Sequence, residues 1–178
     1  MSTRERILDA AWQITSEQGW SAITMSRLGE AAGVSRQSVY NEFGTKQQVA
    51  EALVARELQR FLAAVDAGLA QGATPGESVQ RGGRAVLDLA ADNPMLKATL
   101  SAAAGSPSPL LPLLTSQALP FIQPATARGE AGLLAAHPEV AGPHLTHAVD
   151  TIVRVVLSHV VQPGPPPDLR WLGDRLLG

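Results

Sequence analysis

Cysteine is absent from this chain of 178 residues, which excludes disulfide bonds and metal sites built on thiolates. Long apolar runs are missing as well, so no membrane span is expected. The first residues, MSTRERILDAAW, do not form a signal peptide, because charged residues fall where its apolar core should be. From these absences we expect a protein of the cytoplasm.

An excess of positive charge is also missing, since the formal net charge is −2. Residues 1–46 are balanced, with Arg4, Arg6, Arg27, Arg36 and Lys46 against Glu5, Asp9, Glu17, Glu30 and Glu42. This balance argues against a binder of bulk polyanions. A DNA-binding protein with so few cations must place each of them well.

Strand-like alternation and internal repeats do not occur, whereas apolar residues recur at three- and four-residue steps. The pattern predicts helices over residues 3–18, 25–32 and 36–43, and a long helix from Lys46 to about Gly68. After a break at residues 72–76, further helices are expected over residues 78–91, 95–103, 109–116, 120–136, 144–161 and 169–177. Residues 163–167 are expected to form a stiff extended linker. The expected fold class is therefore all-α.

Residues 24–46, TMSRLGEAAGVSRQSVYNEFGTK, carry the most specific signal. Gly33 can end a helix in the left-handed conformation, and the hydroxyl of Ser35 can cap the next helix. Met25, Leu28, Ala31 and Ala32 are the expected inward face of the helix before the turn. Two short helices joined in this way form a helix-turn-helix, whose second helix lies in the DNA major groove. This segment predicts a protein that reads a DNA sequence.

The order and spacing of residues 7–53 resemble the TetR family of bacterial transcriptional repressors. The resemblance is carried by Ile7-Leu8-Asp9-Ala10-Ala11, Gly19-Trp20, Thr24, Ala31-Ala32-Gly33-Val34-Ser35, Val39-Tyr40, Phe43 and Lys46. It implies a homodimer bound to an inverted-repeat operator in double-stranded DNA. It also implies that a small inducer binds the helical body and moves the two heads apart through the helix that starts at Lys46.

The expected architecture is thus an N-terminal three-helix helix-turn-helix head, joined by a long helix to a C-terminal helical ligand-binding and dimerisation domain. The head covers residues 1–46, and the second domain covers residues 47–178. The connecting helix starts in residues 46–70, at the junction of the two. Two alternatives stay open: a transcriptional activator of the same architecture, and a ligand- or partner-binding protein of this type without sequence-specific DNA binding.

The helix over residues 36–43 should present its polar side to base edges. Arg36 and Gln37 are the expected base readers, because arginine can grip guanine and glutamine can grip adenine with two hydrogen bonds. Ser38 and Asn41 lie on the same polar side. Expected phosphate contacts are Tyr40, Thr24, Ser26 and Lys46, with Arg4 and Arg6 as an arm that reaches the backbone or the minor groove. Arg27 is a weaker candidate, and Glu42 either points away or accepts from a cytosine amino group.

The helix over residues 144–161 is apolar over more than half of its circumference, as expected of a helix buried on more than one side. A dimer face is predicted at Leu145, Val149, Ile152, Val156 and Val160, completed by residues 120–136 or 169–177. The alternative is a helix at the centre of a monomer.

A pocket for a small apolar or amphipathic inducer is expected in the body. Its candidate lining residues are Phe61, Val65, Leu87, Leu96, Leu100, Leu113, Leu114, Phe121, Val153 and Leu157. Acidic residues are sparse there, which argues against a site for cations. Asn93–Lys97 and Leu110–Thr115 are similar to stretches in some actinobacterial family members linked to alkane or lipid metabolism. A long-chain, lipid-like ligand suits this composition.

Catalysis is not expected, because no Ser-His-Asp order, phosphate-binding glycine loop or usable pair of carboxylates stands out. His144 and His147 lie close in sequence, but a metal site needs a third ligand and supporting partners. No metal and no cofactor are therefore expected.

Overall fold

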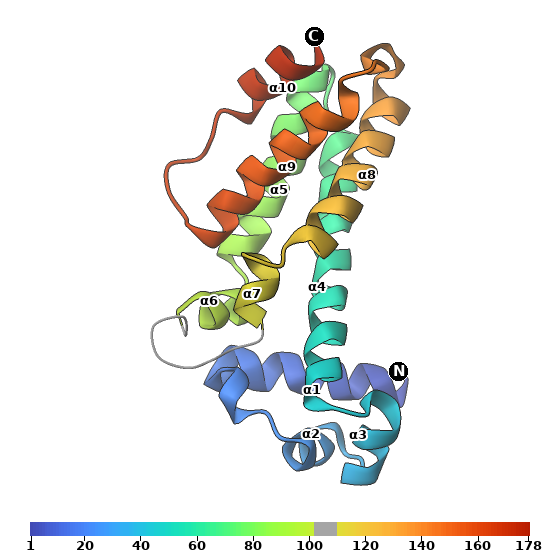
Figure 1. Cartoon of the computed structure of the whole chain (residues 1–178), viewed down its shortest axis with the longest axis vertical. Helices are drawn as coiled ribbons and strands as arrows, with labels where there is room; N and C mark the ends of the chain where they lie inside the picture. Colours follow the sequence, from blue (N-terminus) through green and yellow to red (C-terminus); the bar gives the residue numbers. More distant parts are fainter. Residues whose placement is uncertain (102–109) are drawn as a thin grey trace. The chain divides into compact units, whose positions relative to one another are not determined.

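The computed structural model describes residues 1–101 and 110–178, and of residues 113 and 114 it describes the backbone only. Every regular element in these residues is a helix (Figure 1). The α-helices are α1 (Thr3–Gln18), α2 (Met25–Ala32), α3 (Arg36–Phe43), α4 (Lys46–Leu69), α5 (Pro75–Ala91), α6 (Pro94–Ser101), α7 (Leu110–Leu114), α8 (Leu119–Ala136), α9 (Leu145–Val161) and α10 (Leu169–Leu177). The described residues also contain two short 3₁₀ helices that were not anticipated, η1 (Trp20–Ala22) and η3 (Pro138–Val140).

The predicted bounds are confirmed for α1, α2, α3 and α10 and are close for most of the others. Helix α5 begins at Pro75, three residues before the expected start, because the hydroxyl of Thr74 caps it by accepting from the backbone N–H of Glu77. A proline in the first helical turn is favourable, since its missing N–H would have had no partner. Residues 102, 103 and 109, also expected to be helical, lie outside the described residues.

The chain divides into two compact units. The first contains residues 1–57 and 93–116, and the second contains residues 58–92 and 117–178. This division differs from the expected boundary between residues 46 and 47. Helix α4 contributes to both units, and α6 and α7 belong with the N-terminal helices.

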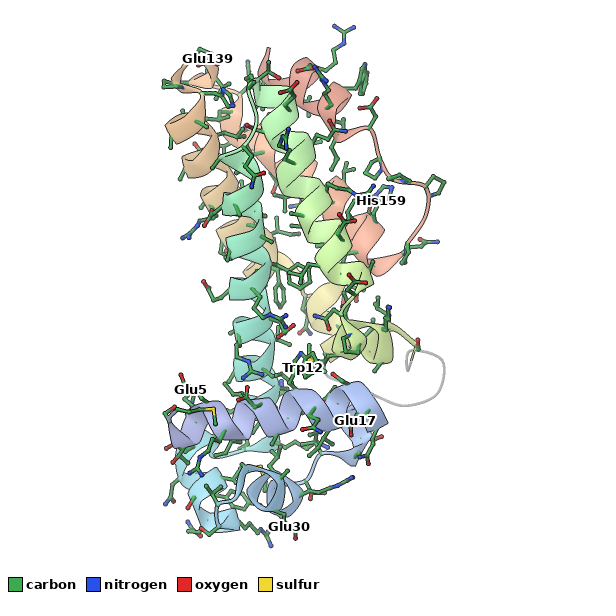
Figure 2. All side chains as sticks on the ribbon, turned by 180° about the vertical axis from the view of Figure 1, so that it is seen from behind. Glu5, Trp12, Glu17, Glu30, Glu139 and His159 are labelled. Atoms are coloured by element: carbon green, nitrogen blue, oxygen red, sulfur yellow. The ribbon has the colours of Figure 1, made fainter. Side chains whose placement is uncertain are left out.

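In the first unit, α1 contacts α2, α3 and α6. The centre of this unit is fully buried and apolar, with Ile7, Ala11, Leu28, Val39, Val49 and Leu53 at 0 % exposure. One expectation is wrong: Ala31 is exposed, and the buried face of α2 consists of Met25, Leu28, Gly29 and Ala32. Figure 2 shows Glu30, the neighbour of Ala31, on the outer side of α2.

A polar link also holds α6 in the first unit. The side-chain amide of Asn93 donates to Oε2 of Glu57 on α4 over 2.8 Å, and both side chains are buried. Oδ1 of Asn93 accepts from the backbone N–H of Leu96 over 2.9 Å, which caps the start of α6. The amide of Asn93 therefore fixes the first turn of α6 against α4.

Small residues allow the helices of the second unit to approach closely. An added Cβ on Gly68 of α4 would lie 2.5 Å from the Cα of Gly82 of α5, so the two backbones touch there. A Cβ on Gly173 of α10 would lie 2.8 Å from the Cα of Gly76, at the start of α5. Helix α9 packs against α5, α8 and α10. Figure 1 shows α5, α8 and α9 running alongside the end of α4 that belongs to this unit.

Ser78 makes a buried polar link in the same unit. Its hydroxyl donates to the backbone carbonyl of Leu69 over 2.8 Å and lies 2.8 Å from Nε2 of His137. Because the hydroxyl hydrogen is used on Leu69, Nε2–H of His137 is the donor to Ser78 Oγ. Nδ1 of His137 lies 3.5 Å from Oε1 of Glu139, an exposed side chain on η3 that is labelled in Figure 2. The ends of α4 and α8 are thereby joined to α5.

We predict that Ser78→Ala lowers the free energy of unfolding by about 1–2 kcal/mol, because it leaves the buried Nε2–H of His137 and the carbonyl of Leu69 without their partner. Urea denaturation followed by circular dichroism at fixed protein concentration measures the change. Ser158→Ala is the matched control, since Ser158 is exposed on α9 and its loss should change stability by less than about 0.5 kcal/mol. Equal effects of the two substitutions would contradict the structural role of Ser78.

Within the described residues, none of the helices is long and apolar enough to cross a membrane.

Candidate functional site

The turn between α2 and α3 has the geometry that the sequence predicted. Gly33 adopts the left-handed conformation with φ 64° and ψ 40°. The hydroxyl of Thr24 accepts from the backbone N–H of Arg27 at the start of α2, and the hydroxyl of Ser35 accepts from that of Ser38 at the start of α3. These caps fix where each helix begins and hence the angle at which α3 leaves the turn.

Gly29 is a residue of this motif that we did not predict. A Cβ at this position would lie 2.8 Å from the carbonyl oxygen of Val34 and 3.2 Å from the backbone nitrogen of Arg36. The backbone N–H of Val34 also donates to the carbonyl of Gly29 over 2.8 Å. The sequence contains one signal for this role: Gly29 stands four residues, or about one helical turn, before Gly33.

The orientation of α3 is set by its two buried residues. Val39 is 0 % exposed and Phe43 is 4 % exposed, so the opposite side of this helix faces outward. Arg36, Gln37, Tyr40 and Asn41 are all exposed on this outward side, and Ser38 is half-buried beside them. The structure therefore brings five of the predicted DNA-contacting residues together on α3.

Two pairs of side chains order this outward surface. Arg36 donates to the hydroxyl of Tyr40 over 3.2 Å, and its guanidinium carbon lies 5.3 Å from the centre of the Tyr40 ring. Gln37 donates from Nε2 to Oδ1 of Asn41 over 3.0 Å. Each pair joins positions i and i+4, which are neighbours on a helix surface. The hydroxyl of Tyr40 keeps its own hydrogen free to donate to an external acceptor.

Lys46, at the start of α4, is half-buried, and its ammonium lies 5.2 Å from the centre of the Trp20 ring. Partial burial lowers the pKa of Lys46, because it removes water from the ammonium group. Less water then remains to be displaced when this group meets a phosphate. Thr24 and Ser26, the other predicted phosphate contacts, are exposed at the start of α2.

The arginines near the N-terminus are placed differently from a free arm. The guanidinium of Arg4 lies 4.3 Å from the centre of the Phe43 ring and donates to the carbonyl oxygen of Glu42 over 3.1 Å. It thus binds the C-terminal end of α3, where cations are favourable. Arg6 is half-buried. Arg27 is also engaged, because it donates to the carbonyl of Ala22 and to the side chain of Gln18.

From this geometry we predict that Arg4→Ala reduces the stability of the folded chain by about 0.5–1 kcal/mol through the lost contact with Phe43. The slope of log K against log salt for DNA binding should stay unchanged, because no phosphate contact is removed. Lys46→Ala is the comparison, and its slope should fall by about one. Salt titrations followed by fluorescence anisotropy distinguish the two variants. A lower slope for Arg4→Ala would mean that Arg4 contacts DNA as part of an arm.

The predicted dimer-face residues lie inside the chain. Leu145, Val149, Ile152, Val156 and Val160 are each no more than 8 % exposed in a single copy. Side chains that are already buried within one copy have little surface left for a partner, so these five residues alone could bury little area in a dimer, and the dimer face on α9 stays a prediction. The hydrophobic pattern located the buried side of α9, but that side packs against α5, α8 and α10 of the same chain.

The predicted pocket residues fall into both units. Leu96 is buried and Leu100 is half-buried in the first unit. In the second unit six large apolar side chains are half-buried, namely Phe61, Val65, Leu87, Phe121, Val153 and Leu157. The side chains of Leu113 and Leu114 lie outside the described residues.

A surface groove of about 700 Å³ lies between α4, α5 and α10 of the second unit. Small residues such as Ala64, Gly68 and Ala85 line it, together with the charged residues Glu77, Arg81, Arg84, Asp88 and Arg170. None of the predicted pocket residues lines this groove. Within the described residues, no three histidine, aspartate or glutamate side chains are grouped so that they could hold a metal ion.

Comparisons with known proteins agree with this arrangement. A family model described as "Bacterial regulatory proteins, tetR family" matches residues 7–53, and one described as "Bacterial Tetracyclin repressor, C-terminal domain" matches residues 75–170. The chain is 33 % identical over 161 residues to the HTH-type transcriptional regulator AlkX of Mycobacterium tuberculosis (strain ATCC 25618 / H37Rv), which covers 90 % of this chain and 75 % of that protein. It is 35 % identical over 72 residues to the HTH-type transcriptional repressor KstR of the same organism, which covers 40 % of this chain and 33 % of that protein.

A solved structure also resembles the whole chain. It is that of the TetR family repressor AlkX from Dietzia sp. strain DQ12-45-1b, a protein implicated in biodegradation of n-alkanes. The match has a TM-score of 0.76 and 26 % identity, and it covers 99 % of this chain and 94 % of that one. These relatives are regulators of transcription and not enzymes. With both family models and a relative matched along most of its length, the chain belongs to the TetR family of helix-turn-helix transcriptional regulators.

Proposed function

We propose that this regulator is a repressor that binds an inverted-repeat operator as a homodimer in the cytoplasm and is released by a small apolar or amphipathic ligand. The proposed DNA binding rests on the outward surface of α3. Its polar side chains Arg36, Gln37, Tyr40 and Asn41 are exposed together, while Val39 and Phe43 fix the helix in the core. A rigidly held helix with such a surface suits the major groove.

In this proposal Arg36 and Gln37 contact base edges and thereby carry sequence information. Tyr40, Lys46, Thr24 and Ser26 contact phosphates, which set the register of the protein on the duplex. Ser38 is a lesser contact, since its hydroxyl lies 2.9 Å from that of Ser35. Arg6 is retained as a backbone contact, and Arg4 is assigned instead to holding the end of α3.

The proposed dimer face includes the exposed side of α8, one of the two segments expected to complete it. Pro120, Ala127, Ala131 and Ala135 are exposed at spacings that place them along one line of this helix. Leu119, at its start, is 58 % exposed. Small side chains permit a close approach of two helices, and a symmetric pair would bury the same apolar line twice.

The ligand part of the proposal is supported by the six half-buried apolar side chains of the second unit. Four helices of this unit leave such side chains incompletely covered: Phe61 and Val65 on α4, Leu87 on α5, Phe121 on α8, and Val153 and Leu157 on α9. An aliphatic chain would cover this surface and gain from its removal from water. The similarity to the repressor implicated in n-alkane biodegradation favours a long-chain aliphatic molecule of this kind.

Two measurements test the proposal. Native mass spectrometry of the purified protein is expected to detect a dimer that retains a lipid-like molecule. A labelled operator fragment, selected from genomic DNA, should then be released when a C16 alkane, alcohol or fatty acid is added in micelle-free solution. Tight operator binding that none of these compounds changes would contradict the ligand part, and the absence of any selected fragment would contradict the DNA part.

A further inference from the structure

We propose that Gln37 and Asn41 act as a single composite reader that recognises one adenine in each half of the operator. The inference rests on the proposed function, in which the outward surface of α3 enters the major groove. It goes further by assigning a specificity role to Asn41 and by naming the base that the pair recognises.

The pair is already assembled in the structure without DNA. Nε2 of Gln37 donates to Oδ1 of Asn41 over 3.0 Å, and both side chains are exposed on the first two turns of α3. This hydrogen bond holds the two amide groups against each other. Oε1 of Gln37 is left as an acceptor and Nδ2 of Asn41 as a donor, and in the described part of the chain neither atom has another partner. Nε2 of Gln37 keeps its second hydrogen as a further donor.

An acceptor and a donor offered by two joined side chains match one base in the major groove. Adenine presents its N6 amino group as a donor beside N7 as an acceptor, so Oε1 of Gln37 can accept from N6 while Nδ2 of Asn41 donates to N7. Guanine presents two acceptors at this edge, and cytosine presents a donor without an acceptor beside it. Thymine presents one acceptor and a methyl group. Each of these bases would leave either Oε1 of Gln37 or Nδ2 of Asn41 without a partner.

The hydrogen bond between the two side chains also explains why a pair is better than a lone glutamine. A free glutamine rotates among several rotamers and must be ordered on binding, at a cost in entropy. Here Asn41 holds the amide of Gln37 before DNA arrives. Arg36, held in the same way by Tyr40, presents only donors and therefore suits a guanine in the same half-site.

The test compares three full-length proteins: the natural chain, Asn41→Asp and Gln47→Glu. Asn41→Asp replaces the free donor by an acceptor, so the pair then offers two acceptors, which suit the amino group of cytosine. Gln47→Glu is the matched control, because it adds the same negative charge at an exposed position on α4, outside α3. Each protein selects bound fragments from a pool of random DNA, and anisotropy titrations at fixed salt then measure affinities for the selected site and its base variants.

We expect the natural chain to prefer adenine at one position of each half-site by about tenfold over the other bases. Asn41→Asp should lower the ratio of affinities for adenine over cytosine at that position by about tenfold or more, whereas Gln47→Glu should weaken all sites and leave the ratio unchanged. The ratio is the readout because a uniform loss of affinity cancels from it. An unchanged ratio for Asn41→Asp would overturn the composite reader while leaving DNA binding intact. A natural chain that selects no sequence would overturn the proposed function itself.

Discussion

Replacing Arg36 by alanine is expected to lower affinity for the operator by about 5- to 100-fold and to remove the base preference at one position of each half-site. Arg36 is exposed at the first position of α3, and its guanidinium is oriented by the hydroxyl and ring of Tyr40. A guanidinium held in this way can donate two hydrogen bonds to guanine. The measurement is an anisotropy titration of the selected operator and of the same fragment with that guanine replaced.

Lys46→Ala provides the contrast to this result, because a phosphate contact carries no sequence information. It should weaken binding to every fragment by a similar factor and lower the salt dependence, while the ratio between operator and variant stays constant. If Arg36→Ala also left that ratio constant, Arg36 would be a phosphate contact, and the assignment of α3 residues to base reading would be wrong.

Replacing Gly68 by valine is expected to lower the free energy of unfolding by about 2–3 kcal/mol. An added Cβ would lie 2.5 Å from the Cα of Gly82 and 2.7 Å from the carbonyl carbon of Arg81, and both are backbone atoms of α5 that no side-chain rotation can remove. Helices α4 and α5 would have to separate, which exposes apolar surface along their contact. Urea denaturation at fixed protein concentration measures the loss.

Ala67→Val is the control for this substitution, because Ala67 is the neighbouring residue on α4 and is exposed. It carries the cost of a β-branched residue relative to alanine in a helix, which is about 0.5 kcal/mol, but meets no backbone. In Gly68→Val the change in helix propensity is no penalty, because glycine is the poorer helix former. A loss for Gly68→Val no larger than that for Ala67→Val would mean that α4 and α5 do not depend on close contact at this point.

The head could be predicted from the sequence because its signals are local. Thr24 and Ser35 cap the two short helices and Gly33 ends the first of them, and each acts on backbone groups within a few residues of itself. Helix α1 carried a further local signal that we did not use. Ser2 and Glu5 form a capping box, in which the hydroxyl of Ser2 accepts from the N–H of Glu5 and the carboxylate of Glu5 accepts from the N–H of Ser2.

Contacts between distant residues could not be predicted. The binding of Arg4 to Phe43 and to the carbonyl of Glu42 joins residues nearly forty positions apart, and no local pattern distinguishes it from a free arm. Gly29 faces inward because α3 approaches α2 closely, which depends on the turn and not on the apolar character of the residue. Ala31, the more apolar choice, is therefore exposed.

For a related reason, the dimer face could not be located from the sequence alone. The hydrophobic pattern of α9 shows that most of this helix is buried, but it does not say whether the covering surface belongs to the same chain. In the structure, Leu145, Val149 and Val156 are covered within one copy. The exposed apolar line on α8 consists mostly of alanine, which contributes little to a hydrophobic pattern, so residues 120–136 could be named only as one of two segments that complete the dimer face.

Sequencing of the genomic fragments that the full-length protein retains at physiological salt tests the central claim most directly. If the outward surface of α3 reads DNA as half of a symmetric dimer, the fragments should share an inverted repeat whose half-sites are separated by about one turn of the duplex or somewhat more. Disruption of either half-site should then abolish binding. Retention of fragments with no common sequence, or of a single unrepeated site bound by one copy, would contradict the account.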